Sequence, residues 1–190
     1  MKEKSKFLKP EYLENRELSW LQFNKRILAE AKDKSILLFE RMKFLSISAS
    51  NLDEFFMIRI ASLMDMVHAG YNKKDIAGMT AQQQLDVIIP ETKEFMADQY
   101  TTYNRALLPR LEKCGLHIIR HHEDLTEQQA EYVDEYFKRN VYPVLTPMAV
   151  DQSRPFPLIQ NKTLNIGALI KDKKNEDVVD IAIQKHIKND

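Results

Sequence analysis

Apolar residues recur at the three-to-four-residue spacing of amphipathic helices throughout the first 113 positions of the chain. This pattern predicts four helices, over residues 16–32, 35–48, 51 to about 70, and 81–113. Pro90 lies inside the last of them, where it is expected to kink the helix or split it in two. Short connections between long helices predict an antiparallel helical bundle.

Residues with cap chemistry stand at the predicted helix ends. Asn15 and Thr80 can each accept hydrogen bonds from the first turn of the helix that follows. Gly70 and Gly115 suit the position just after a helix, where a left-handed backbone is common. In the first helix we expect one stripe to face inward, made of Trp20, Phe23, Asn24, Ile27, Leu28 and Ala31.

The pattern changes after Gly115. Residues 116–120 read as a short strand. Thr126 with Gln129 forms a capping-box sequence that opens a helix to about Val141, with Val133, Phe137 and Val141 inward. Alternating apolar residues over 164–170 and 179–183 predict a β-hairpin with its turn at 171–176.

The predicted fold class is therefore mainly α, with an antiparallel helical bundle followed by the start of an α+β head domain. We expect a polar tail over residues 1–14, a helical domain over 15–113 and a head domain over 114–190. A lone hairpin, one strand and one helix make a thin core, so we expect the head domain to be truncated.

Charge and composition exclude several functional classes. Lys and Arg number 28, as do Asp and Glu, so there is no global basic field and we expect no nucleic-acid partner. A local cationic pocket remains compatible with zero net charge. The single cysteine, Cys114, excludes an intrachain disulfide and suggests a cytoplasmic location. No apolar run reaches the roughly 20 residues that span a bilayer, so no transmembrane segment is expected.

Common catalytic motifs are missing from the sequence. No phosphate-binding glycine loop, HExxH or CxxC pair occurs. The adjacent pair His121 and His122 reads as part of a solvated loop, because neighbouring residues seldom face one metal ion.

The stretch Ser50-Asn51-Leu52-Asp53-Glu54-Phe55-Phe56 is the most informative one for function. Asn51 stands where it can cap the third predicted helix, with Glu54 reaching back to the Asn51 backbone N–H. An amide also offers a donor and an acceptor side by side, which matches the edge of a nucleobase. Local sequence alone favours the cap. The nearby residues Phe44, Phe55, Phe56 and Met57 could wall a base pocket, although core packing is the expected role for most of them.

Four motifs in a fixed order carry a family resemblance. They are Arg16-Glu17-Leu18-Ser19-Trp20-Leu21-x-Phe23-Asn24-x-Arg26-Ile27-Leu28, Glu40 to Ile47, Ser50 to Arg59, and Tyr142 to Asp151 followed by Arg154-Pro155-Phe156-Pro157. This series strongly resembles the N-terminal part of the phosphohistidine-type polyphosphate kinases, from about Arg16 onward.

The resemblance implies a transferase that reversibly moves the terminal phosphate of ATP onto inorganic polyphosphate, as a phosphoprotein with a phosphohistidine. It implies ATP and ADP as substrates, Mg²⁺ bound by domains absent from this chain, and a homo-oligomer. It places Asn51 against the adenine of ATP and puts the catalytic histidine elsewhere, so this segment alone is expected to be inactive.

Two hypotheses stay open at this point. In the first, the segment recognises adenine through Asn51. In the second, it is an assembly module for subunit contacts, and Asn51 only caps a helix.

Overall fold

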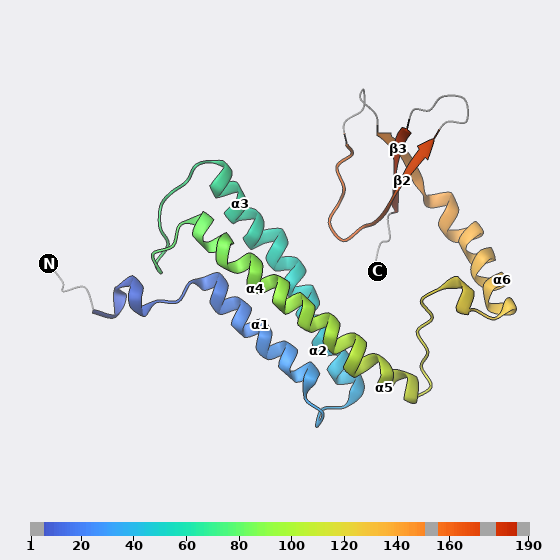
Figure 1. The fold of residues 1–190 in the computed structure, drawn as a ribbon, viewed down its shortest axis with the longest axis horizontal. Helices are drawn as coiled ribbons and strands as arrows, with labels where there is room; N and C mark the ends of the chain where they lie inside the picture. Colours follow the sequence, from blue (N-terminus) through green and yellow to red (C-terminus); the bar gives the residue numbers. More distant parts are fainter. Residues whose placement is uncertain (1–5, 151–155, 172–177, 186–190) are drawn as a thin grey trace. The chain divides into compact units, whose positions relative to one another are not determined.

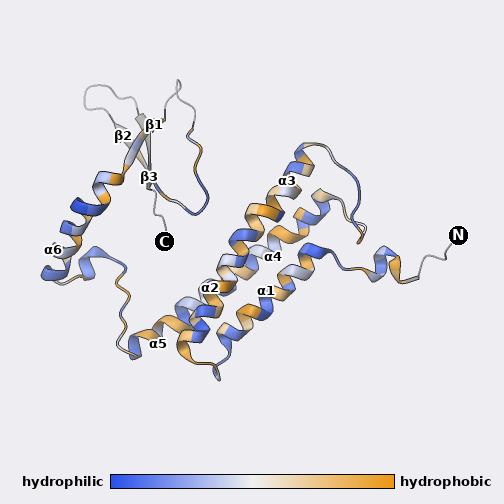
Figure 2. Cartoon of the chain, turned by 180° about the vertical axis from the view of Figure 1, so that it is seen from behind, coloured by the Kyte–Doolittle hydropathy of each residue, from blue (hydrophilic) through white to orange (hydrophobic). Residues whose placement is uncertain are grey.

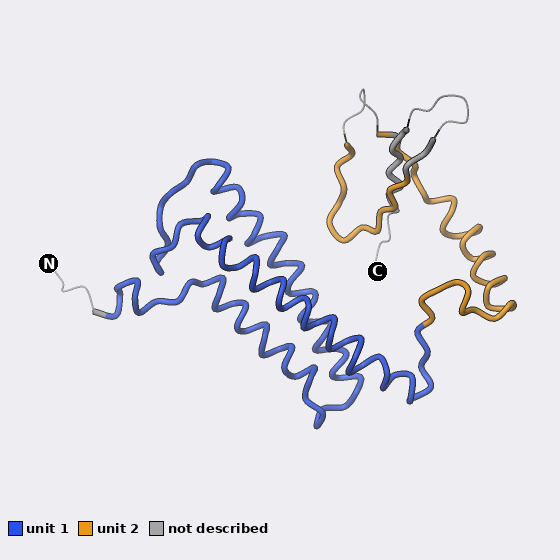
Figure 3. The backbone as a smooth tube through the Cα atoms, in the orientation of Figure 1, with its two compact units in different colours: residues 1–118 blue, residues 119–190 orange. Residues whose placement is uncertain are grey.

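The structure, a computed structural model, describes residues 6–150, 156–171 and 178–185. The chain forms two compact units, Met1–Ile118 and Ile119–Asp190 (Figure 3). The domain boundary expected between residues 113 and 114 stays a prediction.

Helices make up the first unit (Figure 1). Two short 3-10 turns, Lys6–Leu8 and Pro10–Tyr12, precede α1. The helices that follow are α1 (Arg16–Lys32), α2 (Leu38–Glu54), α3 (Ala61–His68), α4 (Ala81–Thr101) and α5 (Leu108–Lys113). α1 packs on α2 and α4, and α3 packs on α4, so the predicted antiparallel bundle is confirmed.

The expectation that a helix begins at Asn51 is wrong. α2 continues through a π-helical segment, Phe55–Ile60, directly into α3, and the backbone stays right-handed helical at both junctions. Asn51 lies in the interior of this continuous helix, so neither its cap nor the capping box with Glu54 exists. No Gly or Pro stands between Leu38 and His68, and an interior Asn costs at most about 0.7 kcal/mol relative to Ala. That cost is too small to break a helix with one buried face.

The π-helical segments have a packing reason. Phe55 and Ile60 are both buried although they lie five positions apart, as are Thr102 and Leu107 in the segment Thr102–Leu107 between α4 and α5. In an α-helix, five positions rotate a side chain about 140° past a full turn. Hydrogen bonds from i to i+5 widen the helix and bring both residues toward the same core.

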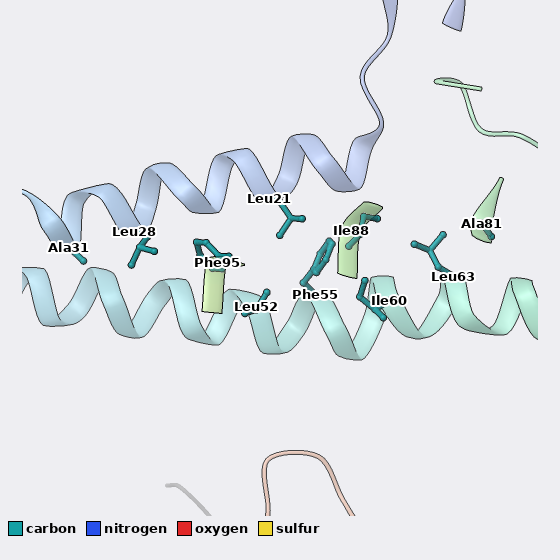
Figure 4. Packing of buried hydrophobic residues seen from close by; sticks show 10 residues of the cluster. All are labelled: Leu21, Leu28, Ala31, Leu52, Phe55, Ile60, Leu63, Ala81, Ile88 and Phe95. Atoms are coloured by element: carbon teal, nitrogen blue, oxygen red, sulfur yellow. The ribbon is translucent and has the colours of Figure 1, made fainter. Parts of the chain in front are cut away.

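The core of the bundle runs along the interface of its helices (Figure 4). Hydrophobic and hydrophilic positions alternate along each helix in Figure 2, as burial on one face requires. The buried cluster comprises Leu21, Leu28, Ala31, Leu52, Phe55, Ile60, Leu63, Ala81, Ile88 and Phe95.

One residue of the predicted inward stripe faces elsewhere. Phe23 is 49% exposed, and Leu21, absent from the prediction, is buried in its place. α4 also runs through Pro90 without a break, so the helix is not split there. Pro90 is exposed, and water can therefore satisfy the carbonyl that loses its helical partner.

The predicted caps at Asn15, Thr80, Gly70 and Gly115 are confirmed. The Asn15 side chain accepts hydrogen bonds from the backbone N–H groups of the first turn of α1, and Thr80 forms a capping box with Gln83. Gly70 and Gly115 have positive φ angles, 67° and 80°, and each closes its helix with the paired bonds of a Schellman motif.

Asn15 also connects three parts of the bundle. Its Nδ2 donates to Asp75 Oδ2 (2.7 Å) in the loop before α4 and to Gln84 Oε1 (2.9 Å) within α4. All four hydrogen-bonding positions of this buried amide are therefore used.

The second unit contains α6 (Glu127–Tyr136), which opens on the predicted Thr126 capping box and continues as a π-helical segment, Phe137–Val141. Three strands follow, β1 (Thr146–Val150), β2 (Leu164–Lys171) and β3 (Val178–Lys185), in the order β1-β3-β2 with antiparallel pairing. The predicted hairpin is confirmed as β2 and β3; its turn lies outside the described residues.

Two expectations for this unit are wrong, and one strand is additional to those predicted. Residues 116–120 form no strand, since the described part of the chain offers them no partner strand. The additional strand is β1, which contains Pro147, a residue that an edge strand tolerates. Val133 and Phe137, expected to face inward, are 42% and 44% exposed, so the described residues cover their side chains only in part. None of the described helices is long and apolar enough to cross a membrane.

The connecting role of Asn15 generates a stability prediction. Asn15→Ala removes the α1 cap and the donor that bonds Oε1 of Gln84, which together should cost about 2–4 kcal/mol in the free energy of unfolding. Thr80→Ala, which removes a cap without a contact to another helix, is the matched control and should cost about 1 kcal/mol. Urea unfolding of both variants measures the difference; equal losses would contradict the role of Asn15 between elements.

Candidate functional site

A pocket of about 270 Å³ lies where α1 faces the junction of α2 with its π-helical segment. This volume is near the lower end of the roughly 300–1,000 Å³ typical of small-molecule pockets, which suits one flat ring system. Its walls combine apolar, polar and charged side chains, namely Trp20, Phe23, Asn51, Glu54, Phe55, Ile58 and Arg59.

Helical geometry explains why these residues meet. Asn51, Phe55 and Ile58 follow one another at intervals of four and three, so they form a stripe along one side of the continuous helix. Trp20 and Phe23 occupy one face of α1 in the same way. The Trp20 ring stacks on the buried Phe55 ring with centroids 4.3 Å apart and an interplanar angle of 7°, which ties the two walls together.

Asn51 is half-buried at the side of this pocket. Its Nδ2 donates to Oδ1 of Asn24, on α1, at 2.9 Å. Asn24 is fully buried, and its own Nδ2 has no hydrogen-bond partner among the described residues. The buried amide of Asn24 therefore holds the half-buried amide of Asn51 in place by a single hydrogen bond.

This bond leaves half of the Asn51 amide unused. The second Nδ2–H and the Oδ1 of Asn51 have no partner within the described ranges. They form a donor beside an acceptor in a pocket with aromatic walls. Such a pair can hydrogen-bond the adenine edge, which offers an amino donor beside a ring-nitrogen acceptor.

Charged groups border the pocket as well. The buried carboxylate of Glu17 accepts bonds from Nε and Nη2 of Arg16, at 2.9 and 2.6 Å, and lies 4.0 Å from Nε of Arg59. Arg59, 46% exposed on its side chain, thus has one side held by Glu17 and the other at the pocket. Glu54 adds a carboxylate to the lining, which opposes a phosphate group inside the pocket.

The structure changes the predicted surroundings of Asn51. Of the four residues named as a possible wall, Phe55 lines the pocket, and Phe44 and Phe56 pack against the core, the role expected for most of the four. Met57 is not among the lining residues. Sequence reasoning missed the contribution of α1, especially Asn24 and Phe23, because it placed both residues in the core stripe. A polar residue and an aromatic residue adjacent on that stripe were the available signal.

Comparison with known proteins places the chain among its relatives. The family model for the polyphosphate kinase N-terminal domain matches residues 13–119, and that for the polyphosphate kinase middle domain matches residues 128–187. The chain is 49% identical over 164 residues to a polyphosphate kinase of Bacillus anthracis, covering 86% of the chain and 23% of that protein. It is 47% identical over 180 residues to one of Lactiplantibacillus plantarum, covering 93% of the chain and 25% of that protein.

A solved structure is similar as well. The crystal structure of a polyphosphate kinase from Porphyromonas gingivalis matches with a TM-score of 0.66 and 26% sequence identity, covering 89% of this chain and 24% of that chain. The present chain therefore spans about a quarter of the length of the relatives it matches.

Proposed function

Because this chain belongs to the polyphosphate kinase family, we propose that it holds the adenine base of ATP in the pocket beside Asn51. The observation that carries the proposal is the half-used amide of Asn51, fixed by the buried Asn24 and open to a ligand on its other side. A polyphosphate kinase takes its phosphate from ATP, and the adenine base of ATP has an edge that matches the free donor and acceptor of Asn51.

The pocket suits the base better than the phosphates. Phe23 and Trp20 contribute aromatic rings to the pocket wall, whereas Glu54 repels phosphate oxygens. The triphosphate would extend out of the pocket. In phosphoryl transfer, positioning and charge stabilisation supply most of the catalysis, and this chain contributes the positioning of the base.

The remainder of the reaction is proposed on the family resemblance. The complete enzyme reversibly transfers the terminal phosphate of ATP to inorganic polyphosphate through a phosphohistidine, in the cytoplasm and as a homo-oligomer. His68, His117, His121 and His122 are all exposed, and none lines the adenine pocket. We assign the phosphohistidine to none of them; His186 lies outside the described residues.

The part of the chain that the structure describes contains no cluster of metal-ligating side chains. Within the ranges that the structure describes, no group of three or more His, Cys, Asp or Glu side chains could hold a metal ion. The Mg²⁺ that the resemblance implies is therefore proposed to bind other parts of the enzyme.

A second candidate function is assembly. Exposed aromatic and apolar side chains on and after α6 favour a role in subunit contacts, and they are Tyr132, Val133, Tyr136, Phe137 and Tyr142. The assembly hypothesis gives Asn51 only a capping role, and the interior position of Asn51 in α2 excludes that role.

Asn51→Asp in the complete enzyme distinguishes the two functions. The substitution removes the N–H donor but keeps an acceptor, and Asn24 can turn its unpartnered Nδ2 toward the new carboxylate. We expect the KM for ATP to rise about tenfold, or about 1.4 kcal/mol of lost binding, while the Tm stays unchanged.

Asn104→Asp is the matched control, because this exposed amide donates a hydrogen bond to the backbone carbonyl of Tyr100 and does not line the pocket. It should leave the KM for ATP as in the wild type. An unchanged KM in Asn51→Asp would reject adenine recognition and favour the assembly function.

We also expect the isolated 190-residue chain to be inactive, since it contains neither a proposed phosphohistidine nor a metal site among its described residues. Incubation with ATP and Mg²⁺, followed by an assay for inorganic polyphosphate, tests this. Synthesis of polyphosphate by the purified chain would show that the transfer machinery is present in it.

A further inference from the structure

A second pocket, of about 400 Å³, lies between the α1–α2 connection and the last turns of the α4–α5 helix. Five of its seven lining residues are Lys or Arg: Lys34, Arg41, Arg105, Arg110 and Lys113, with Ala106 and Pro109 completing the wall. In a chain with zero net charge, such a concentration of one sign is a local feature rather than a consequence of composition.

Arg41 forms the buried floor of this cationic pocket. It is only 2% exposed, and its Nε donates to the carbonyl oxygen of Ala31 at 2.8 Å at the end of α1. Its Nη2 lies 3.5 Å from the carbonyl oxygen of Lys32, but its buried Nη1 has no hydrogen-bond partner among the described residues. The contacts with the end of α1 thus account for Nε and Nη2 of the guanidinium. They do not account for the burial of Nη1.

The cations of the pocket are poorly neutralised. Burial, and then the charge of Arg110, lower the pKa of Arg41 from its usual value, whereas Asp33 acts in the opposite direction. No described carboxylate lies within 4.0 Å of the charged groups of Lys34, Arg105, Arg110 or Lys113. Assembling like charges without counter-ions raises the free energy of the folded state, and a bound anion would reverse that cost.

The arrangement suits an extended anion. Arg105, Pro109 and Lys113 follow at intervals of four and so share one face of the helix, with Ala106 and Arg110 beside them. At about 1.5 Å per residue, the cations from Arg105 to Lys113 spread over roughly 12 Å. None of the lining residues is aromatic, so the pocket offers no ring on which a nucleobase can stack.

We propose that this pocket binds a segment of an inorganic polyphosphate chain, with Arg41 at its floor and Arg105, Arg110, Lys34 and Lys113 along it. The site is distinct from the adenine pocket, with which it shares no residue. The chemical requirement is a row of phosphate oxyanions; the choice of inorganic polyphosphate as their source rests on the proposed function. Binding there would hold the growing or shrinking chain on the helical unit.

Equilibrium binding of long-chain inorganic polyphosphate to the 190-residue chain, by titration calorimetry without ATP, tests the proposal. Arg105→Gln/Arg110→Gln removes two exposed cations of the pocket and should raise the Kd at least about tenfold at fixed salt. Lys93→Gln/Lys138→Gln removes two exposed cations outside the pocket and should change the Kd less than about twofold.

Two further titrations test whether the loss of affinity comes from the charges of the pocket and is specific to polyphosphate. Arg105→Lys/Arg110→Lys keeps the charges, and since Lys also binds phosphate well its Kd should remain near that of the wild type. The Kd for a single-stranded RNA with the same number of phosphates should change little on the glutamine substitutions.

Several results would overturn the proposal: no polyphosphate binding by the wild type, equal Kd values for wild type and pocket variant, an equal loss in the control or lysine variant, or an equal loss of RNA affinity. Because ATP is absent from the titration, these results are independent of adenine recognition at Asn51.

Discussion

The continuous helix formed by α2, its π-helical segment and α3 is the constraint on which the rest of the bundle depends. Phe55 and Ile60 must both enter the core although five positions separate them, and the π-helical turn permits this. An ordinary α-helix would turn one of these two side chains away from α1 and α4. Burying both large side chains favours the uninterrupted helix by several kcal/mol, far more than the interior Asn51 costs.

The same constraint makes the pocket that we propose for adenine. With the helix continuous, Asn51 points from its side toward Asn24 of α1 instead of capping a helix end. Asn24 is fully buried, so the hydrogen bond it accepts fixes the Asn51 amide in one orientation. A preorganised donor and acceptor beside aromatic walls discriminates between bases at a smaller entropic cost than a mobile side chain would.

Much of this fold could be predicted from periodicity and cap chemistry. α1 has its predicted bounds, and the ends at Asn15, Thr80, Gly70 and Gly115 follow from local bonds that sequence alone displays. The error at Asn51 arose because capping residues also occur inside helices, and tertiary burial decides between the two positions. The Asn24–Asn51 bond and the cationic pocket at Arg41 join residues from different helices, so they required the packed structure.

Base selectivity of the complete enzyme tests the central claim, that the Asn51 amide reads the edge of adenine, most directly. The measurement is the ratio of kcat/KM for ATP to kcat/KM for GTP, in the wild type and in Asn51→Asp. A carboxylate only accepts hydrogen bonds, and guanine presents two adjacent donors, so the account predicts that the substitution lowers the preference for ATP at least about tenfold. An unchanged ratio would show that Asn51 does not read the base.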